Sequence, residues 1–136
     1  MESLAVVDTN VVSYIFRRHT LGGPYSEILK NYQKLLISFQ TVAELEVLVA
    51  KNNWGESRRA ELVEFLKTYG VAFPNRRVCA EWATIRIFRG GLGEPIEAQD
   101  AWIAATALVL NAALITHDVF DFRKIDGLRV VTSARG

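Results

Sequence analysis

The sequence predicts an α/β sandwich with a mainly parallel central sheet. Short, continuous apolar runs alternate with amphipathic segments that are long enough to form helices. Strands with no polar face of their own are typical of parallel sheets, because helices cover both sides of such a sheet. The 136 residues, half of them hydrophobic, are enough for one domain with a sizeable core, and we take residues 1–136 as a single domain.

The predicted elements alternate along the whole chain. Strands are expected at 4–7, 35–38, 71–73, 113–116 and 128–131, where Val, Ile, Leu and Ala predominate. Helices are expected at 10–16, 24–32, 41–52, 56–69, 77–89 and 95–110. Pro24 suits the first turn of the second helix, and Gly90 with Gly91 is expected to end the fifth.

Composition limits the class of protein. The formal net charge is +1, so any contact with nucleic acid must come from local clusters of Lys and Arg. The one cysteine, Cys79, excludes an intrachain disulfide, and we expect it to be a core residue beside Val78, Trp82 and Ile85. No basic segment precedes the first apolar run, and no apolar run reaches the roughly 18 residues of a membrane span. We therefore expect a soluble, cytoplasmic protein.

Acidic residues follow two of the predicted strands. Asp8 comes directly after Val7, and Asp118 follows Thr116 with one residue between them. In parallel α/β sheets, ligands bind beyond the carboxyl ends of the strands, so both are candidate site residues. The alternative for Asp8 is a helix N-cap, a role that is compatible with the first. The alternative for Asp118 is turn chemistry, which we favour for the neighbouring Asp121.

Two more acids lie near the starts of predicted helices. Glu44 completes a Thr-x-x-Glu pattern with Thr41, which is typical of a capping box and is the structural alternative to a site role. Asp100 shares a helical stripe with apolar residues, where a carboxylate needs a cation or hydrogen bonds. Its alternative is a partly exposed acid favoured by the helix dipole. The apolar residues of that stripe are Ile96, Ile103, Ala104, Ala107 and Leu108.

The four acids can meet at one edge of a parallel sheet. Converging carboxylates repel one another and take up protons unless a cation neutralises them. A hard ion with oxygen ligands, Mg²⁺ or alternatively Mn²⁺, fits such a cluster, and the sequence has no zinc-like Cys and His spacing. Metal sites of this kind hydrolyse phosphodiesters.

Four blocks of the sequence stand out: 6–13 (VVDTNVVS), 41–45 (TVAEL), 93–96 with 100–107 (GEPI, DAWIAATA), and 114–122 with 127–130 (LITHDVFDF, GLRV). They resemble the motifs of PIN-domain nucleases, in the same order and over the length of the chain. The compact form resembles the VapC toxins in particular.

The resemblance implies a metal-dependent endoribonuclease with a PIN-like α/β/α sandwich fold. It also implies that the protein is the toxin of a toxin–antitoxin pair, that it forms a homodimer, and that a small cognate antitoxin blocks it. Its acidic metal site would comprise Asp8, Glu44, Asp100 and Asp118, with Asn10 and Thr116 as hydrogen-bonding supports and Asp121 as an outer acid.

Contact with RNA is the least constrained part of this interpretation. We expect it at Arg17 and Arg18, which follow the first helix, although basic residues are commonly just solvated. The alternative function is a non-catalytic PIN-like module that binds RNA or protein. A receiver domain and a haloacid-dehalogenase-type phosphatase are disfavoured, because Asn10 stands where the latter has its second Asp and no Lys follows the late strand.

Overall fold

The computed structural model describes residues 2–134 and contains a five-stranded sheet in the order β3-β2-β1-β4-β5. Every neighbouring pair of strands is parallel, which confirms the predicted α/β fold class. The strands are β1 (Glu2–Val7), β2 (Tyr32–Ser38), β3 (Gly70–Ala72), β4 (Ala113–Ile115) and β5 (Val130–Val131).

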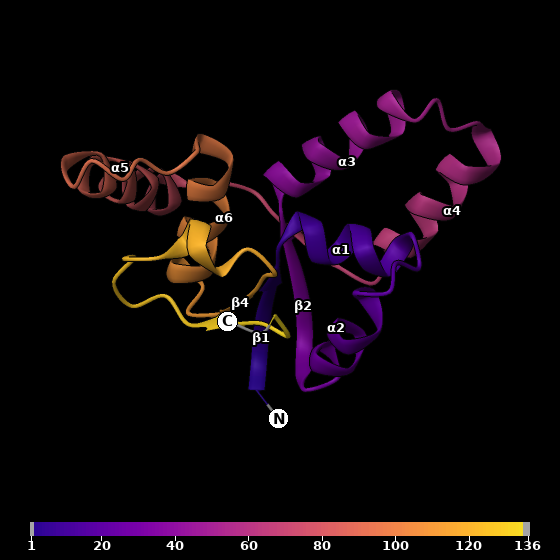
Figure 1. Ribbon diagram of the computed structural model, residues 1–136, viewed down its shortest axis with the longest axis horizontal. Coiled ribbons are helices and arrows are strands. Elements are labelled where there is room, and N and C mark those ends of the chain that lie inside the picture. Colours follow the sequence, from indigo (N-terminus) through magenta and orange to yellow (C-terminus); the bar gives the residue numbers. More distant parts are fainter. Residues whose placement is uncertain (1, 135–136) are drawn as a thin grey trace.

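Helices cover both faces of this sheet. Figure 1 shows α1 to α4 on one side of the strands and α5 with α6 on the other. The helices are α1 (Thr9–Phe16), α2 (Gly22–Leu29), α3 (Phe39–Lys51), α4 (Glu56–Leu66), α5 (Arg76–Gly91) and α6 (Ala98–Val109), and a short 3₁₀ helix, η1 (Val119–Phe122), follows β4.

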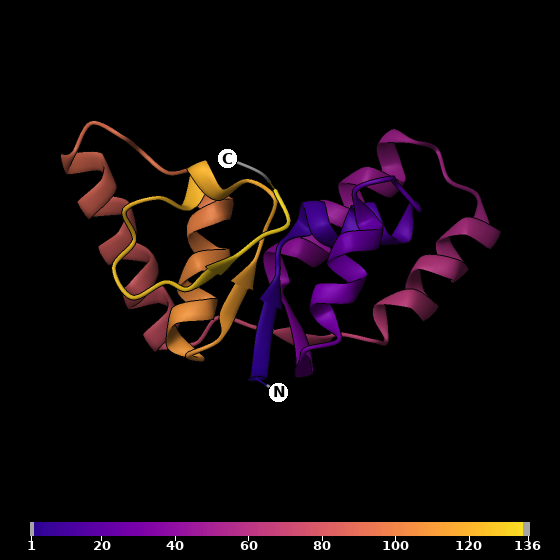
Figure 2. The same cartoon turned by 60° about the horizontal axis from the view of Figure 1, so that its bottom comes forward.

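Alternate residues of β1 enter two separate hydrophobic cores. Ala5 and Val7 pack with residues of α1 to α4, whereas Val6 packs with residues of α5 and α6. All three side chains are fully buried, as expected for a central strand of a parallel sheet. β1 pairs with both β2 and β4, so its carboxyl end lies at the centre of the molecule (Figure 2).

Several predicted positions were wrong. Cys79 is exposed, because the neighbouring Val78 takes the inward position in the first turn of α5. Tyr32 begins β2 and does not end the second helix. The last long helix begins at Ala98, after Pro95, and the final strand is limited to Val130–Val131. Within the described residues, no helix combines the length and apolar character needed to cross a membrane.

Candidate acidic site at the strand ends

The centre of the site is Asp8, at the carboxyl end of β1. The strand register pairs Val7 with Ile115, and the backbone N–H of Asp8 donates to the Ile115 carbonyl at 2.9 Å. Asp8 Oδ1 accepts from the Thr9 backbone N–H at 2.8 Å, and Oδ2 accepts from the Thr116 hydroxyl at 2.7 Å. The carboxylate therefore caps α1, as one of the two interpretations predicted, and lies against the end of β4.

Thr116 and Asn10 connect Asp8 to Asp118. The Thr116 hydroxyl, which is fully buried, accepts from the backbone N–H of Asp118 at 3.0 Å. Asn10 Nδ2 donates to Asp118 Oδ2 at 2.7 Å. These two residues thus occupy positions from which they hold the exposed Asp118 beside the buried Asp8.

One atom of this network has no partner. Asn10 Oδ1 is buried and accepts no hydrogen bond from any residue in the described part of the chain. Most buried polar atoms are satisfied, and an exception commonly marks a place where water or an ion completes the structure. An unpaired carbonyl oxygen next to carboxylates is the kind of group that binds a hard cation or its water.

Glu44 is free of the capping role that its sequence pattern predicted. The N-cap of α3 is Ser38, whose hydroxyl accepts from the Gln40 backbone N–H at 3.1 Å, so the capping-box prediction was wrong. Thr41 lies inside the first turn, and its hydroxyl is 2.9 Å from that of Thr9. Gln40 Nε2 donates to Glu44 Oε1 at 3.4 Å, and burial raises the pKa of the half-buried Glu44 carboxyl.

Asp100 lies in the first turn of α6 and completes the group. Burial raises its pKa to about 7, and the negative charges of Asp8, Asp121, Glu44 and Asp118 add to the increase. Burial likewise raises the pKa of Asp8 to about 6 against the lowering effect of its hydrogen bonds, with Glu44 and Asp118 contributing to the rise. The carboxylates therefore share one electrostatic environment, although they come from three helices and two strand ends.

The site suits a hydrated hard cation better than a tightly caged one. Among residues 2–134, no three His, Cys, Asp or Glu side chains converge closely enough to form a ready metal cage. Mg²⁺ commonly keeps several waters and uses only one or two carboxylates, so an open arrangement of oxygen donors is consistent with it. The donor set of carboxylates and one unpaired amide oxygen fits that ion chemically.

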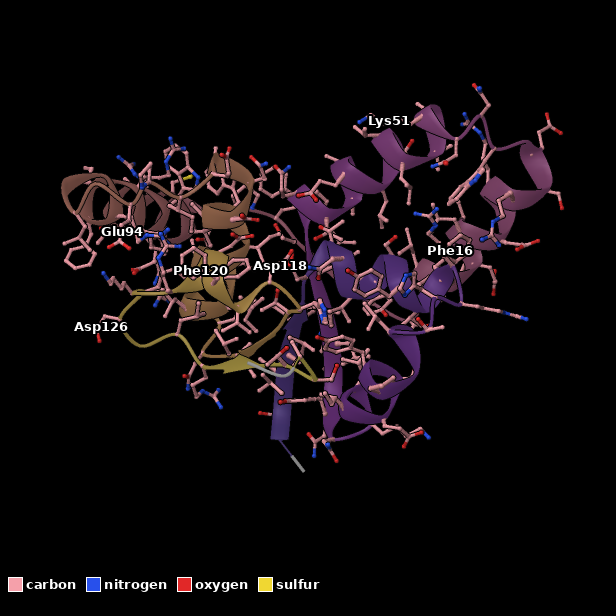
Figure 3. The ribbon with its side chains drawn as sticks, viewed as in Figure 1. Phe16, Lys51, Glu94, Asp118, Phe120 and Asp126 are labelled. Atoms are coloured by element: carbon pink, nitrogen blue, oxygen red, sulfur yellow. The ribbon has the colours of Figure 1, made fainter. Side chains whose placement is uncertain are left out.

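The predicted basic residues lie elsewhere. Arg17 and Arg18 follow the last residue of α1, about 12 Å along an eight-residue helix from Asp8. Figure 3 shows the neighbouring Phe16 well separated from Asp118. Both arginines line a different groove, with Arg58 and Glu61, so they do not adjoin the acidic site.

Sequence reasoning overlooked Gln40, Thr9 and the Tyr25–His117 pair. The buried Tyr25 hydroxyl lies 2.7 Å from His117 Nδ1 and 3.1 Å from the Thr132 hydroxyl. This contact fixes α2 against the segment that follows β4. No local pattern joins residues so distant in the chain, whereas Thr9 could have been noticed as the polar residue between Asp8 and Asn10.

The fold and the site together define a class: a parallel α/β sandwich with acidic side chains gathered near the carboxyl ends of its central strands. Comparison with known proteins gives the family. The profile described as "PIN domain" matches residues 5–128, and the chain belongs to this family.

Individual relatives agree with that assignment. The chain is 34% identical over 128 residues to Ribonuclease VapC1 of Haemophilus influenzae, covering 91% of this chain and 93% of the relative. It is also similar to a chain in the crystal structure of VapBC2 from Rickettsia felis bound to a promoter DNA fragment, with a TM-score of 0.83, 25% identity and coverage of 95% and 98%. A toxin–antitoxin complex from Klebsiella pneumoniae gives a TM-score of 0.72 at 25% identity, covering 94% of this chain and 96% of that one.

Proposed function

We propose that this protein is a Mg²⁺-dependent endoribonuclease, for which Mn²⁺ can substitute, and that it cleaves RNA in the cytoplasm. The observation that carries the proposal is that Asp8 and Asp100 lie in one group of acids, in which the negative charge of Asp8 adds to the raised pKa of Asp100. Both carboxyl groups have strongly raised pKa values in a shared field of negative charge. A site that concentrates repelling carboxylates destabilises the protein unless a cation binds there.

The residues that would hold the ion are Asp8 and Asp100, with Glu44 and Asp118 at the periphery. When bound, Mg²⁺ neutralises phosphate oxygens and lowers the pKa of a coordinated water. Thr116 and the Thr9 backbone fix the orientation of Asp8, and Asn10 fixes that of Asp118. These hydrogen bonds reduce the reorganisation that the side chains need when the ion and the phosphate arrive. Asp121 lies near enough to raise the pKa of Asp100 and would act as an outer acid.

We further propose that the chain is the toxin of a toxin–antitoxin pair and acts as a homodimer with a small antitoxin as its natural partner. Support comes from its similarity to Ribonuclease VapC1 and to a chain of a toxin–antitoxin complex over most of the length of each. The similarity to a chain of such a complex suggests that this protein also has a surface that binds an antitoxin. An antitoxin that inhibits cleavage would have to cover the acidic site.

The experiment that tests the nuclease activity is a cleavage assay on purified protein and single-stranded RNA. We expect cleavage with Mg²⁺ or Mn²⁺ and none with a chelator. Asp8→Asn and Asp100→Asn should lose activity and keep their fold, as judged by circular dichroism. Asp126→Asn is the matched control, because this exposed Asp precedes Gly127 in a loop outside the cluster, and it should cleave normally.

Two results would contradict the proposal. One is equal cleavage in the presence of chelator. The other is intact RNA in all conditions together with metal-independent RNA binding, which would identify a non-catalytic RNA-binding module.

A further inference from the structure

A groove of about 800 Å³ adjoins the acidic site on the side of η1. Asp118 and Asp121 belong to its lining, and so do Phe120 and Arg123. The volume lies within the range of pockets that hold small-molecule ligands. The groove therefore continues from carboxylates that we assign to the reaction onto a surface to which that reaction gives no role.

The side chain of Phe120 lines this groove and is largely exposed to solvent. It is 72% exposed, whereas Phe122, two residues later in η1, is 3% exposed and packs in the core with α6. With about three residues per turn, the 3₁₀ helix turns one aromatic ring inward and the other outward. Phe122 thus anchors the segment while Phe120 faces solvent between Asp118 and Glu94 in Figure 3.

Arg123 covers one face of the Phe120 ring. Its guanidinium carbon lies 3.8 Å from the ring centroid, Nε donates to Glu94 Oε1 at 3.0 Å, and Nη1 donates to the Phe120 carbonyl at 2.8 Å. The buried Arg89 also donates to the carbonyls of Asp121 and Arg123 at 3.0 and 3.1 Å. Phe120 and Arg123 therefore form a preorganised platform, called here the aromatic platform.

We propose that the aromatic platform binds a nucleobase of single-stranded RNA that flanks the phosphate at the acidic site. This inference rests on the proposed ribonuclease function. Bases of single-stranded RNA stack on aromatic rings and guanidinium planes, and such stacking tolerates any base. An RNA strand carries a base beside every phosphate, and Phe120 lines the same groove as Asp118 and Asp121. Arg123 and Lys124 both line the groove and share the carboxylate of Glu94, so this side of the groove carries positive as well as negative charge.

The test combines two changes, one in the protein and one in the RNA. The protein variants are Phe120→Leu, which keeps apolar volume and removes the π face, and Phe120→Tyr, which keeps both. Phe73→Leu is the control, because Phe73 is 75% exposed and follows β3, two strands away from β1. The RNA is a short oligonucleotide with one defined cleavage site and a series with a single abasic position on either side. Binding is measured by fluorescence anisotropy in Ca²⁺, and KM and kcat are measured in Mg²⁺.

We expect Phe120→Leu to weaken binding and raise KM about tenfold with little change in kcat, and Phe120→Tyr to behave like the wild type. One abasic position should weaken wild-type binding to a similar extent and have no further effect on Phe120→Leu, because both changes remove the same contact.

Three outcomes separate the possibilities. If wild-type protein cleaves RNA but Phe120→Leu and Phe73→Leu behave alike, the platform is not a base subsite and the ribonuclease function stands. If wild-type protein does not cleave but binding depends on Phe120 and on one base, the subsite stands and the function fails. If Phe120→Leu loses only its association with a protein partner, the groove is a protein-docking surface and the nucleobase proposal is wrong.

Discussion

Two polar clusters in the described part of the chain differ in how neighbouring groups satisfy a buried charge. At the end of α5, Arg89 is 1% exposed, and its guanidinium donates to the carbonyls of Glu94, Pro95, Asp121 and Arg123 at 2.6 to 3.4 Å. At the end of β1, the 5%-exposed Asp8 lies among other carboxylates, and the neighbouring Asn10 Oδ1 has no partner in the described chain.

This difference indicates a structural role for the Arg89 cluster and a ligand-binding role for the carboxylate cluster. The Arg89 cluster satisfies its own donors, so it stabilises the loops that it joins and needs no ligand. The carboxylate cluster brings like charges together, and their mutual repulsion costs stability and favours binding of a cation. Both clusters meet at η1, since Arg89 holds the backbone of the segment that carries Asp118 and Asp121.

The largest effect that we predict is on stability at the satisfied cluster. Arg89→Met leaves four carbonyls without their donor and removes a buried, fully hydrogen-bonded side chain, which should lower the free energy of unfolding by about 3 kcal/mol. Urea denaturation measures this change. The exposed Arg77→Met, also on α5, should alter stability by less than about 0.5 kcal/mol. If Arg89→Met lowered the free energy of unfolding as little as Arg77→Met does, the Arg89 cluster would not have the structural role assigned to it.

At the carboxylate cluster, activity and stability should move in opposite directions. Asp100→Asn removes like-charge repulsion and should keep or raise the unfolding midpoint, while RNA cleavage falls at least about 100-fold. Glu97→Gln, at the exposed N-cap of the same helix, is the matched control and should leave both quantities unchanged. Marked destabilisation of Asp100→Asn would show instead that this carboxylate is a structural group.

A smaller effect is expected from the hydroxyl that positions Asp8. Thr116→Val is nearly isosteric, but it removes the donor to Asp8 and the acceptor for the Asp118 backbone N–H. We predict about a tenfold loss of kcat/KM and a shift of the acid limb of the pH–rate profile to higher pH. Thr84→Val, which removes a hydroxyl bonded to the Ala80 carbonyl on α5, serves as the control and should show neither change.

A further effect is expected on the pH dependence of stability without metal. Because the folded-state pKa values of Asp8 and Asp100 are raised to about 6 and about 7 from 3.8, the folded protein binds more protons than the unfolded chain between these limits. Stability should therefore fall as pH rises from about 4 to about 7, and the fall should be shallower in Asp100→Asn. Thermal unfolding in chelator across this pH range measures the change in stability. An Asp100→Asn variant whose stability falls as steeply as that of the wild type would contradict the raised pKa of Asp100.

Much of the fold followed from local patterns, because a strand buried on both faces must be apolar throughout. The continuous apolar runs at β1 and β4 predicted buried strands and placed Asp8 at the carboxyl end of the first strand. The errors arose where a residue satisfies two local rules. Thr41 and Glu44 match a capping box, but Ser38 lies at the strand end and takes the N-cap instead. Cys79 is one position, about 100°, away from the buried Val78.

The convergence of the acids could be anticipated, but their detailed environment could not. Asp100 was recognisable because a carboxylate on an apolar helical stripe conflicts with the pattern around it. The saturation of Arg89 by four carbonyls from two segments of the chain depends on tertiary packing and leaves no trace in local sequence. The distance of Arg17 and Arg18 from the cluster likewise depends on the direction of α1.

The central claim is that the carboxylates around Asp8 and Asp100 bind a divalent cation. Its most direct test is calorimetric titration with Mn²⁺ at pH 6 and at pH 8 in buffers of different ionisation enthalpy. The account predicts saturable binding that releases protons at pH 6, releases almost none at pH 8, and is lost in Asp8→Asn with Asp100→Asn. Absence of binding to the wild type, or unchanged binding to the double variant, would contradict it.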